Sequence, residues 1–225
     1  MREYVIIVAG GSGSRMKSDI PKQFLLVNGL PVLMHTIHAF ATYSQDLNII
    51  VVLPADQLDF WKDLCNEHHF DIQHELITGG STRFHSVQNG LAHITDSEGL
   101  VAVHDGVRPV ISKDIIANGY GEAALHGAAV VSVPLKDSIR IVAQNDGNKS
   151  MDRAQFRLIQ TPQTFRLSWM RTAFNTDYHE SFTDCASVLE AHGYPIRLID
   201  GAYENIKITT PEDLRWAEIY LKATY

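Results

Sequence analysis

A glycine-rich segment near the N-terminus carries cationic side chains at a spacing suited to binding phosphate. The short apolar, β-branched run of residues 4–9 predicts a buried strand. It leads into residues 10–14, where three glycines within four positions let backbone N–H groups converge on an anion without obstruction by Cβ atoms. Arg15 and Lys22 add positive charge beside these amides. The pattern therefore predicts a site that binds a nucleoside triphosphate.

Neither of the two familiar phosphate-binding loops matches this segment. A Walker A loop requires G-x-x-x-x-G-K-[ST], whereas Lys22 lies too far from Gly10 and no Gly-Lys-Ser/Thr follows. A dinucleotide fingerprint requires G-x-G-x-x-G, and Met16 stands where its third glycine would be. The ribose-binding acid expected about 20 residues later is also missing, because that stretch is Asn28-Gly29-Leu30-Pro31. The sequence therefore argues against an NAD-dependent oxidoreductase.

Composition and charge argue against further classes of function. The chain has 225 residues and a formal net charge of −7, whereas a nucleic-acid-binding protein normally shows a basic face. An acidic protein that handles anions must gather its cations locally, and residues 136–171 hold seven Lys or Arg against three Asp. We therefore expect small anionic substrates and no nucleic-acid partner.

The cysteines and the apolar runs bear on where the protein resides. Cys65 and Cys185 lie too far apart in sequence for a redox or zinc pair, and are compatible with a reducing compartment. The N-terminus lacks the features of a signal peptide, and no run approaches the ~20 apolar residues of a membrane span. We therefore expect a soluble, cytoplasmic protein with no membrane partner.

Strand-like runs alternate with helical patterns along a single domain that spans residues 1–225. This β-α-β-α order predicts an α/β, Rossmann-like, three-layer fold in which helices cover both faces of a mostly parallel sheet. In such sheets ligands bind at the carboxyl ends of the strands. The glycine-rich loop, residues 79–83 and residues 105–108 each follow a strand and should converge at that edge. The predicted strands are 48–53, 100–104, 128–133 and 195–199, and the predicted helices begin at Pro31 or span 56–69, 83–94, 113–125, 182–191 and the residues after Pro211.

The alternation is interrupted between residues 135 and 165. Residues 138–142 alternate in polarity, the turn-forming residues 145–148 follow, and residues 157–160 supply a return strand. This pattern predicts a β-hairpin arm that projects from the α/β body. A long two-stranded arm is not stable alone, so it should pack either on its own domain or on another chain.

Six motifs occur in an order that is typical of one enzyme family. They are Ala9-Gly10-Gly11-Ser12-Gly13-Ser14-Arg15-Met16 with Pro21-Lys22-Gln23, then 79–83, 103–109, 133–138, 161–165 and 205–214. Together they resemble the sugar-phosphate nucleotidyltransferases, and among these the cytidylyltransferases that make CDP-methylerythritol in the non-mevalonate isoprenoid pathway. The resemblance covers nearly the whole chain. It implies the nucleotide-diphospho-sugar transferase fold, with the arm 135–165 clasping a second subunit in a homodimer.

The resemblance also implies the reaction. CMP would be transferred from CTP to 2-C-methyl-D-erythritol 4-phosphate, giving 4-diphosphocytidyl-2-C-methyl-D-erythritol and pyrophosphate. The attacking phosphate monoester has a second pKa near ~6, so it needs no general base, and catalysis should consist of positioning and fixed positive charge. Mg²⁺ or another divalent cation would be held mainly by the triphosphate and water, with Asp105 the one candidate for direct ligation.

The family roles transfer to individual residues of this sequence. Asp105 would lie near the ribose and the acceptor, and Arg83 would belong to the nucleotide-binding residues. Ser138 and Arg153 would bind the acceptor phosphate in the partner's active site. The catalytic cations would be Arg15, Lys22, Arg153 and Lys207, the phosphate-binding loop would be Gly10, Gly11, Ser12, Gly13 and Ser14, and the cytosine pocket would be lined by Ala9, Gly80, Ser81 and Ser86.

Several alternatives stay open at this point. The chain could be a ribitol-5-phosphate cytidylyltransferase of the same fold, or a CTP-binding module without catalysis. Arg108 and Asp105 could form a structural ion pair, and Lys207 could be a surface lysine. Ser138 stands where the family more often has threonine, which keeps the hydroxyl group.

Overall fold

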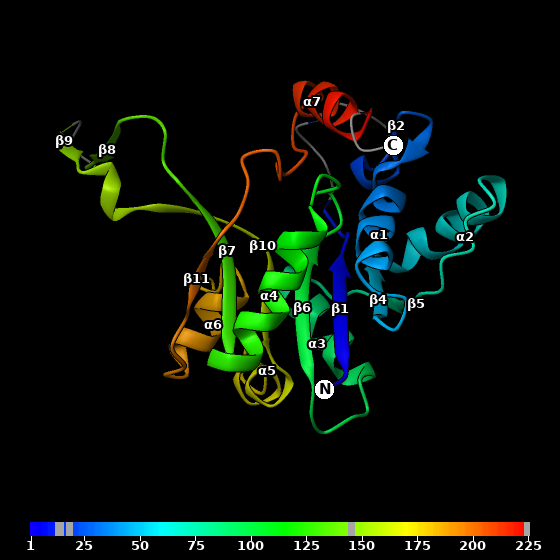
Figure 1. The fold of residues 1–225 in the computed structure, drawn as a ribbon, viewed down its shortest axis with the longest axis horizontal. Coiled ribbons are helices and arrows are strands. Elements are labelled where there is room, and N and C mark those ends of the chain that lie inside the picture. Colours follow the sequence, from blue (N-terminus) through cyan, green and yellow to red (C-terminus); the bar gives the residue numbers. More distant parts are fainter. Residues whose placement is uncertain (12–15, 17–19, 144–146, 223–225) are drawn as a thin grey trace.

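A central sheet of seven strands organises the protein (Figure 1). The computed structural model describes residues 1–11, 16, 20–143 and 147–222. The strand order is β11-β7-β10-β6-β1-β4-β5, and every strand runs parallel to the others except β10. The predicted Rossmann-like α/β fold is therefore confirmed. The strands are β1 (Glu3–Val8), β4 (Asn48–Leu53), β5 (Glu75–Thr78), β6 (Leu100–Asp105), β7 (Ala128–Pro134), β10 (Arg157–Arg166) and β11 (Leu198–Asp200).

The strands β1, β4 and β6 are mostly apolar because helices cover both sheet faces. Ile6 of β1 pairs with Ile50 of β4 on one side and with Val103 of β6 on the other. All three side chains are buried. This pairing brings the carboxyl ends of β1, β4 and β6 to one edge of the sheet.

Each face of the sheet has its own hydrophobic core. One core joins residues such as Ile6, Val87 and Leu189, and the other joins Ile7, Leu33 and Trp61. A third, smaller cluster packs the last helix against the body through Val107 and other apolar residues. The helices are α1 (Val32–Tyr43), α2 (Leu58–Glu67), α3 (Arg83–His93), α4 (Lys113–His126), α5 (Leu167–Ala173), α6 (Cys185–Ala191) and α7 (Pro211–Lys222).

Most predicted elements are present, with shifted boundaries at two helices and at the strand predicted over 195–199, which is shorter and spans 198–200. The helix predicted over 56–69 begins with a 3-10 turn at Ala55–Gln57, and α2 starts at Leu58. The helix predicted over 182–191 starts at Cys185, because Asp184 forms a capping box with Ser187. Neither α5 nor the short hairpin of β2 (Leu26–Val27) and β3 (Leu30–Pro31) is among the elements predicted from the sequence.

The arm differs from its prediction on the C-terminal side. Strand β8 (Ile139–Val142) pairs with β9 (Asn148–Met151) and not with residues 157–160. Those residues begin β10, which lies between β7 and β6 in the central sheet, so the prediction that they return the arm is wrong. Of the predicted turn, residues 145 and 146 lie outside the described residues. Figure 1 shows β8 and β9 projecting away from the α/β body.

Candidate active site

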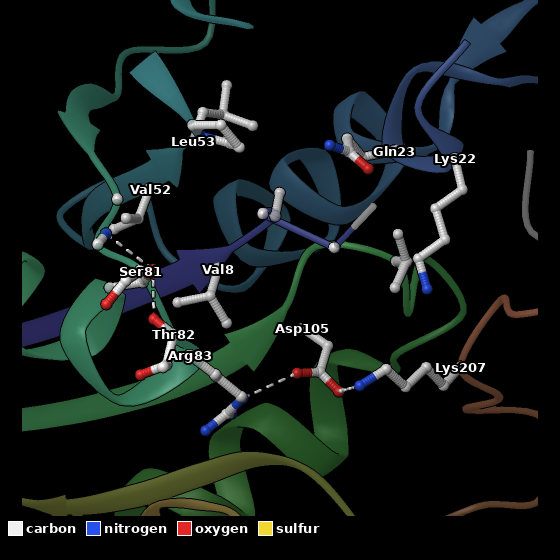
Figure 2. Close-up of a pocket in the computed structure, with 18 residues that line it drawn as sticks. Val8, Lys22, Gln23, Val52, Leu53, Ser81, Thr82, Arg83, Asp105 and Lys207 are labelled. Atoms are coloured by element: carbon white, nitrogen blue, oxygen red, sulfur yellow. Dashed lines mark hydrogen bonds and ion pairs between the residues drawn. The ribbon is translucent and has the colours of Figure 1, made fainter. Parts of the chain in front are cut away.

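A cavity of about 310 Å³ opens at the carboxyl ends of β1, β4 and β6 (Figure 2). The loop before α3 and the segment before α7 complete its walls. Ten of the predicted site residues therefore converge as the strand topology requires. Those that line the cavity are Ala9, Gly10, Gly11, Lys22, Gly80, Ser81, Arg83, Ser86, Asp105 and Lys207.

Six predicted residues are not part of this cavity as described. Ser12, Gly13, Ser14 and Arg15 lie outside the described residues. Ser138 and Arg153 lie on the arm, where the Arg153 guanidinium donates a hydrogen bond to the Lys136 carbonyl oxygen. Within one chain the structure does not bring Ser138 or Arg153 to the cavity.

Lys22 is held against the C-terminal part of the chain. It begins a 3-10 turn (Lys22–Phe24) that follows Pro21. The side chain is largely buried, and its Nζ donates a hydrogen bond to the Ile208 carbonyl oxygen at 3.1 Å. Figure 2 shows the ammonium groups of Lys22 and Lys207 on the side of the cavity opposite Ser81 and Thr82. A fixed cation therefore faces the cavity from the loop that follows β1.

Asp105, the last residue of β6, is surrounded by three cations. Its Oδ2 lies 3.1 Å from Lys207 Nζ and 3.3 Å from Arg108 Nε, and its Oδ1 lies 3.5 Å from Arg83 Nε. Burial alone would raise the pKa of the carboxyl group, but Arg83, Lys207 and Arg108 hold the pKa well below its usual value. With one carboxylate and three cations, the cluster carries a net positive charge at neutral pH, which favours an anionic ligand.

Arg108 joins Asp105 to the segment that carries Lys207. Its guanidinium donates through Nε to Asp105 and through NH1 to the Asn205 carbonyl oxygen at 2.8 Å. Asn205 is fully buried, and its Nδ2 donates to the Thr161 carbonyl oxygen at 2.8 Å. The ion pair between Arg108 and Asp105 that the sequence left open is therefore present. The link to Asn205 was not predicted, because it joins residues 97 positions apart.

The loop before α3 is shaped by its contacts with the first turns of that helix. Thr82 caps α3 by accepting a hydrogen bond from the His85 N–H. Ser86 Oγ accepts from Gly80 N at 3.1 Å and donates to the Thr82 carbonyl oxygen at 2.9 Å. A Cβ on Gly80 would lie 2.4 Å from the His85 Cβ, so only glycine allows this close approach. The contacts fix one wall of the cavity.

Other residues of the cavity are not among those predicted from the sequence. Gln23 is fully buried there, and its Nε2 donates to Gln57 Oε1 at 2.7 Å. Pro54 and Thr82 also line the cavity. The helix-capping role of Thr82 could have been found from its place just before the helical pattern at residue 83.

The charges of the site do not resemble a protein-ligated metal centre. Among the residues that the structure describes, no three or more His, Cys, Asp or Glu side chains are grouped to hold an ion. The one carboxylate of the cluster already faces three cations.

Across the same described ranges, no helix is both long and apolar enough to cross a membrane.

Known proteins share this fold and sequence. The sequence profile of the family described as IspD, 2-C-methyl-D-erythritol 4-phosphate cytidylyltransferase, matches residues 4–223. The chain belongs to this family. The 2-C-methyl-D-erythritol 4-phosphate cytidylyltransferase of Bacteroides thetaiotaomicron is 50% identical over 215 residues, covering 96% of this chain and 97% of that protein. The enzyme of the same name from Porphyromonas gingivalis is 48% identical over 221 residues, covering 98% of both.

Solved structures that carry the name of this enzyme have the same architecture. The crystal structure of the Francisella tularensis 2-C-methyl-D-erythritol 4-phosphate cytidylyltransferase has a TM-score of 0.81 at 33% identity, covering 98% of this chain and 100% of that one. The Thermus thermophilus enzyme has a TM-score of 0.78 at 30% identity, covering 99% and 100%. The IspD fold therefore extends over essentially the whole chain.

Proposed function

We propose that this protein transfers CMP from CTP to 2-C-methyl-D-erythritol 4-phosphate, releasing pyrophosphate and forming 4-diphosphocytidyl-2-C-methyl-D-erythritol. The observation that carries the proposal is the IspD match over residues 4–223. A cationic cavity at the carboxyl edge of the sheet agrees with it, because both substrates are anions. The protein is thus a cytidylyltransferase of non-mevalonate isoprenoid precursor synthesis.

In this proposal CTP occupies the cavity with its base near Ser81 and its triphosphate near Lys22. Among the residues that the structure describes, a Cβ on Gly10 would come no closer than 3.8 Å to a heavy atom outside the adjacent residues, and one on Gly11 no closer than 3.5 Å. Packing against the described part of the chain therefore does not require glycine at either position. Close approach of a phosphate to the backbone does give a reason for glycine there. Ala9, Gly80, Ser81 and Ser86 would line the cytosine pocket, and Ser12, Gly13, Ser14 and Arg15 would complete the phosphate-binding loop.

The chemistry in the proposal is electrostatic. The acceptor phosphate is largely ionised at neutral pH and attacks the α-phosphorus of CTP, with pyrophosphate as the leaving group. Negative charge grows on the phosphoryl oxygens in the transition state, so fixed cations lower the barrier. Lys22 and Lys207 would supply that charge together with Arg15. Asp105 keeps Lys207 oriented toward the cavity through their 3.1 Å contact.

A divalent cation such as Mg²⁺ would accompany CTP rather than occupy a protein site. The described side chains around the cavity do not fit a protein-ligated Mg²⁺, since Asp105 is the one carboxylate among them and it faces Arg83, Arg108 and Lys207. Mg²⁺ commonly uses substrate phosphates and water with few protein carboxylates. We therefore assign it no direct protein ligand.

We further propose a homodimer in which the arm of one chain completes the site of the other. Ser138 and Arg153 would bind the acceptor phosphate there. Two observations support this proposal. The arm carries exposed apolar side chains, with Ile141 59% and Val142 74% exposed, which a second subunit would cover. Ser138 and Arg153 also lie outside the cavity of their own chain.

Pyrophosphate release with CTP and Mg²⁺ tests the proposal directly. Methylerythritol 4-phosphate and ribitol 5-phosphate would be compared side by side at equal concentration. Release with methylerythritol 4-phosphate alone is the expected result, since the IspD relatives carry that acceptor in their names. A preference for ribitol 5-phosphate would contradict the acceptor and keep the reaction type. CTP binding without release from either acceptor would favour a non-catalytic module.

A further inference from the structure

We propose that Lys136 and Tyr203 form a clamp that positions the acceptor-binding residues of the arm, and that both are positioning residues. The inference rests on the proposed function, because it concerns the residues through which the arm would bind the acceptor. Neither side chain lines the cavity, and neither is among the site residues that the family resemblance implies. Both lie at the base of the arm.

The clamp consists of two contacts from one tyrosine. The Tyr203 hydroxyl donates a hydrogen bond to the Pro134 carbonyl oxygen at 2.9 Å. The Lys136 ammonium lies 3.5 Å from the centroid of the Tyr203 ring. Pro134 is the last residue of β7, so Tyr203 contacts the chain both where it leaves the sheet and two residues later. A cation over an aromatic face is an attractive contact even at an exposed site.

Lys136 connects Tyr203 to both segments of the arm. The Lys136 carbonyl oxygen accepts a hydrogen bond from the Arg153 guanidinium, which joins the outgoing and returning segments of the arm. Ser138 is two residues beyond Lys136 on the outgoing segment. The proposed acceptor-binding residues are therefore both close to Lys136, and a change in its position changes theirs.

The segment that carries Tyr203 is itself fixed to the body of the protein. Gly201 N donates to the Ser132 carbonyl oxygen at 2.9 Å, and Gln160 Nε2 donates to the Ala202 carbonyl oxygen at 2.8 Å. Two residues beyond Tyr203, the Asn205 carbonyl oxygen accepts a hydrogen bond from Arg108. Figure 1 shows this segment, which follows β11, running upward past the end of β7 before it reaches α7. Tyr203 is thus held in place relative to the body and can restrain the base of the arm.

The same segment also leads to Lys207, four residues after Tyr203. Tyr203 at one end of the segment would therefore orient the arm residues that bind acceptor in the partner's site. Lys207 at the other end belongs to the cavity of its own chain. An arm that loses the clamp would still fold as β8 and β9, since their pairing is independent of Tyr203. Its acceptor-binding residues would sample more positions, which weakens acceptor binding without affecting CTP.

The test is a double-mutant cycle with Lys136→Met and Tyr203→Leu, measured as the KM for each substrate. Each single variant should raise the KM for methylerythritol 4-phosphate about two- to fivefold, the factor expected for an exposed cation–aromatic contact, and leave the KM for CTP unchanged. The double variant should be no worse than Tyr203→Leu alone, because that change already removes the contact with Lys136. Lys136→Arg, which keeps the cation, should leave the KM for methylerythritol 4-phosphate at the value of the unmodified protein.

Matched controls separate the clamp from general effects. Lys62→Met removes an exposed lysine of α2 whose partner is Asp59, and should change neither KM. Tyr203→Phe keeps the ring and loses the hydrogen bond to Pro134, so it should show a smaller effect than Tyr203→Leu. Independent, additive effects of the two changes, or equal increases in both KM values, would overturn the proposal.

A second readout does not depend on catalysis. Brief trypsin digestion should cleave Tyr203→Leu after Lys136 and Arg153 severalfold faster than the unmodified protein, because the arm base is less restrained. Equal cleavage rates would contradict the clamp. If the unmodified protein releases no pyrophosphate but the cleavage rates differ as expected, the proposed function fails and the clamp stands.

Discussion

Acid should destabilise this protein through His104, the residue that precedes Asp105 on β6. His104 is fully buried, its ring contacts Phe40 edge-on at 4.9 Å between centroids, and its Nε2 lies 3.1 Å from the Arg108 carbonyl oxygen. As a neutral ring it donates that hydrogen bond through Nε2. Burial lowers the pKa of His104 from 6.5 to about 4. The folded protein therefore resists protonation at a position that holds the turn between Asp105 and Arg108.

The sign and size of the effect follow from the two pKa values. In the unfolded chain His104 takes up a proton near pH 6.5, whereas in the folded chain it does so only near pH 4. The unfolded state thus binds more protons between these values, and the free energy of unfolding falls as the pH is lowered through this window. From about pH 7.5 to about pH 5 the contribution amounts to about 2 kcal/mol.

Urea unfolding at both pH values, at one protein concentration, measures this loss. The comparison protein is His104→Gln, which keeps an N–H donor and does not titrate. His35 and His74, whose pKa values burial also lowers, contribute equally to both proteins and cancel in the difference. The unmodified protein should lose about 2 kcal/mol more than the variant. Equal losses would refute the reasoning. If the variant does not fold, an NMR titration should find the His104 pKa near 4, and a value near 6.5 would refute it as well.

Four further predictions concern the cavity and the arm. Lys22→Ala should lower kcat about 100-fold or more, because losing a group that stabilises transition-state charge costs roughly 3–4 kcal/mol; near-normal turnover would remove Lys22 from the mechanism. Gly80→Ala should lower the Tm by several degrees, because its Cβ would lie 2.4 Å from another side chain. Gly10→Ala should keep the Tm and weaken CTP binding in calorimetric titration, because its Cβ would lie 3.8 Å from the nearest atom of the described residues outside its chain neighbours. Mixing Arg153→Ala protein with Lys22→Ala protein should restore partial activity if the arm completes the partner's site, and absence of rescue would indicate sites built within one chain. EDTA should abolish pyrophosphate release without changing the Tm of the free protein; a lower Tm would indicate a metal bound by protein side chains.

The strands of the sheet differ in how well their sequences predict them. β1, β4 and β6 each contain an unbroken run of at least four apolar residues, so the local pattern identifies them. β10 is equally central in the sheet, yet its sequence contains a proline. Proline cannot donate a backbone hydrogen bond and is therefore typical of edge strands and bulges. A register shift between Ile159 and Gln163 accommodates that interruption. The buried residues of β10 that are polar, and so give no strand signal, are Gln160, Thr161, Gln163 and Thr164.

The candidate site divides in a similar way. The cavity residues that follow strands could be predicted, because a parallel sheet gathers them at one edge and the family motifs name them. The Arg108–Asn205 link could not, since no local pattern indicates a contact between residues 97 positions apart. The clamp at the arm base is also invisible in sequence. It joins Tyr203 to Lys136 through a ring contact that depends on how β11 pairs with β7.

Exposure distinguishes the three cations around Asp105 and indicates how the cluster can respond to a substrate. The side chain of Arg108 is 11% exposed and bound at both ends, so it cannot leave the carboxylate without burying an unpaired charge. The Lys207 side chain is 42% exposed and meets the same oxygen at 3.1 Å. The ammonium stays hydrated as it moves, the carboxylate keeps Arg83 and Arg108 as partners, and a phosphate carries more charge than a carboxylate. Lys207 can therefore turn from Asp105 to an incoming phosphate, while Arg108 keeps the carboxylate, and the segment behind it, in place.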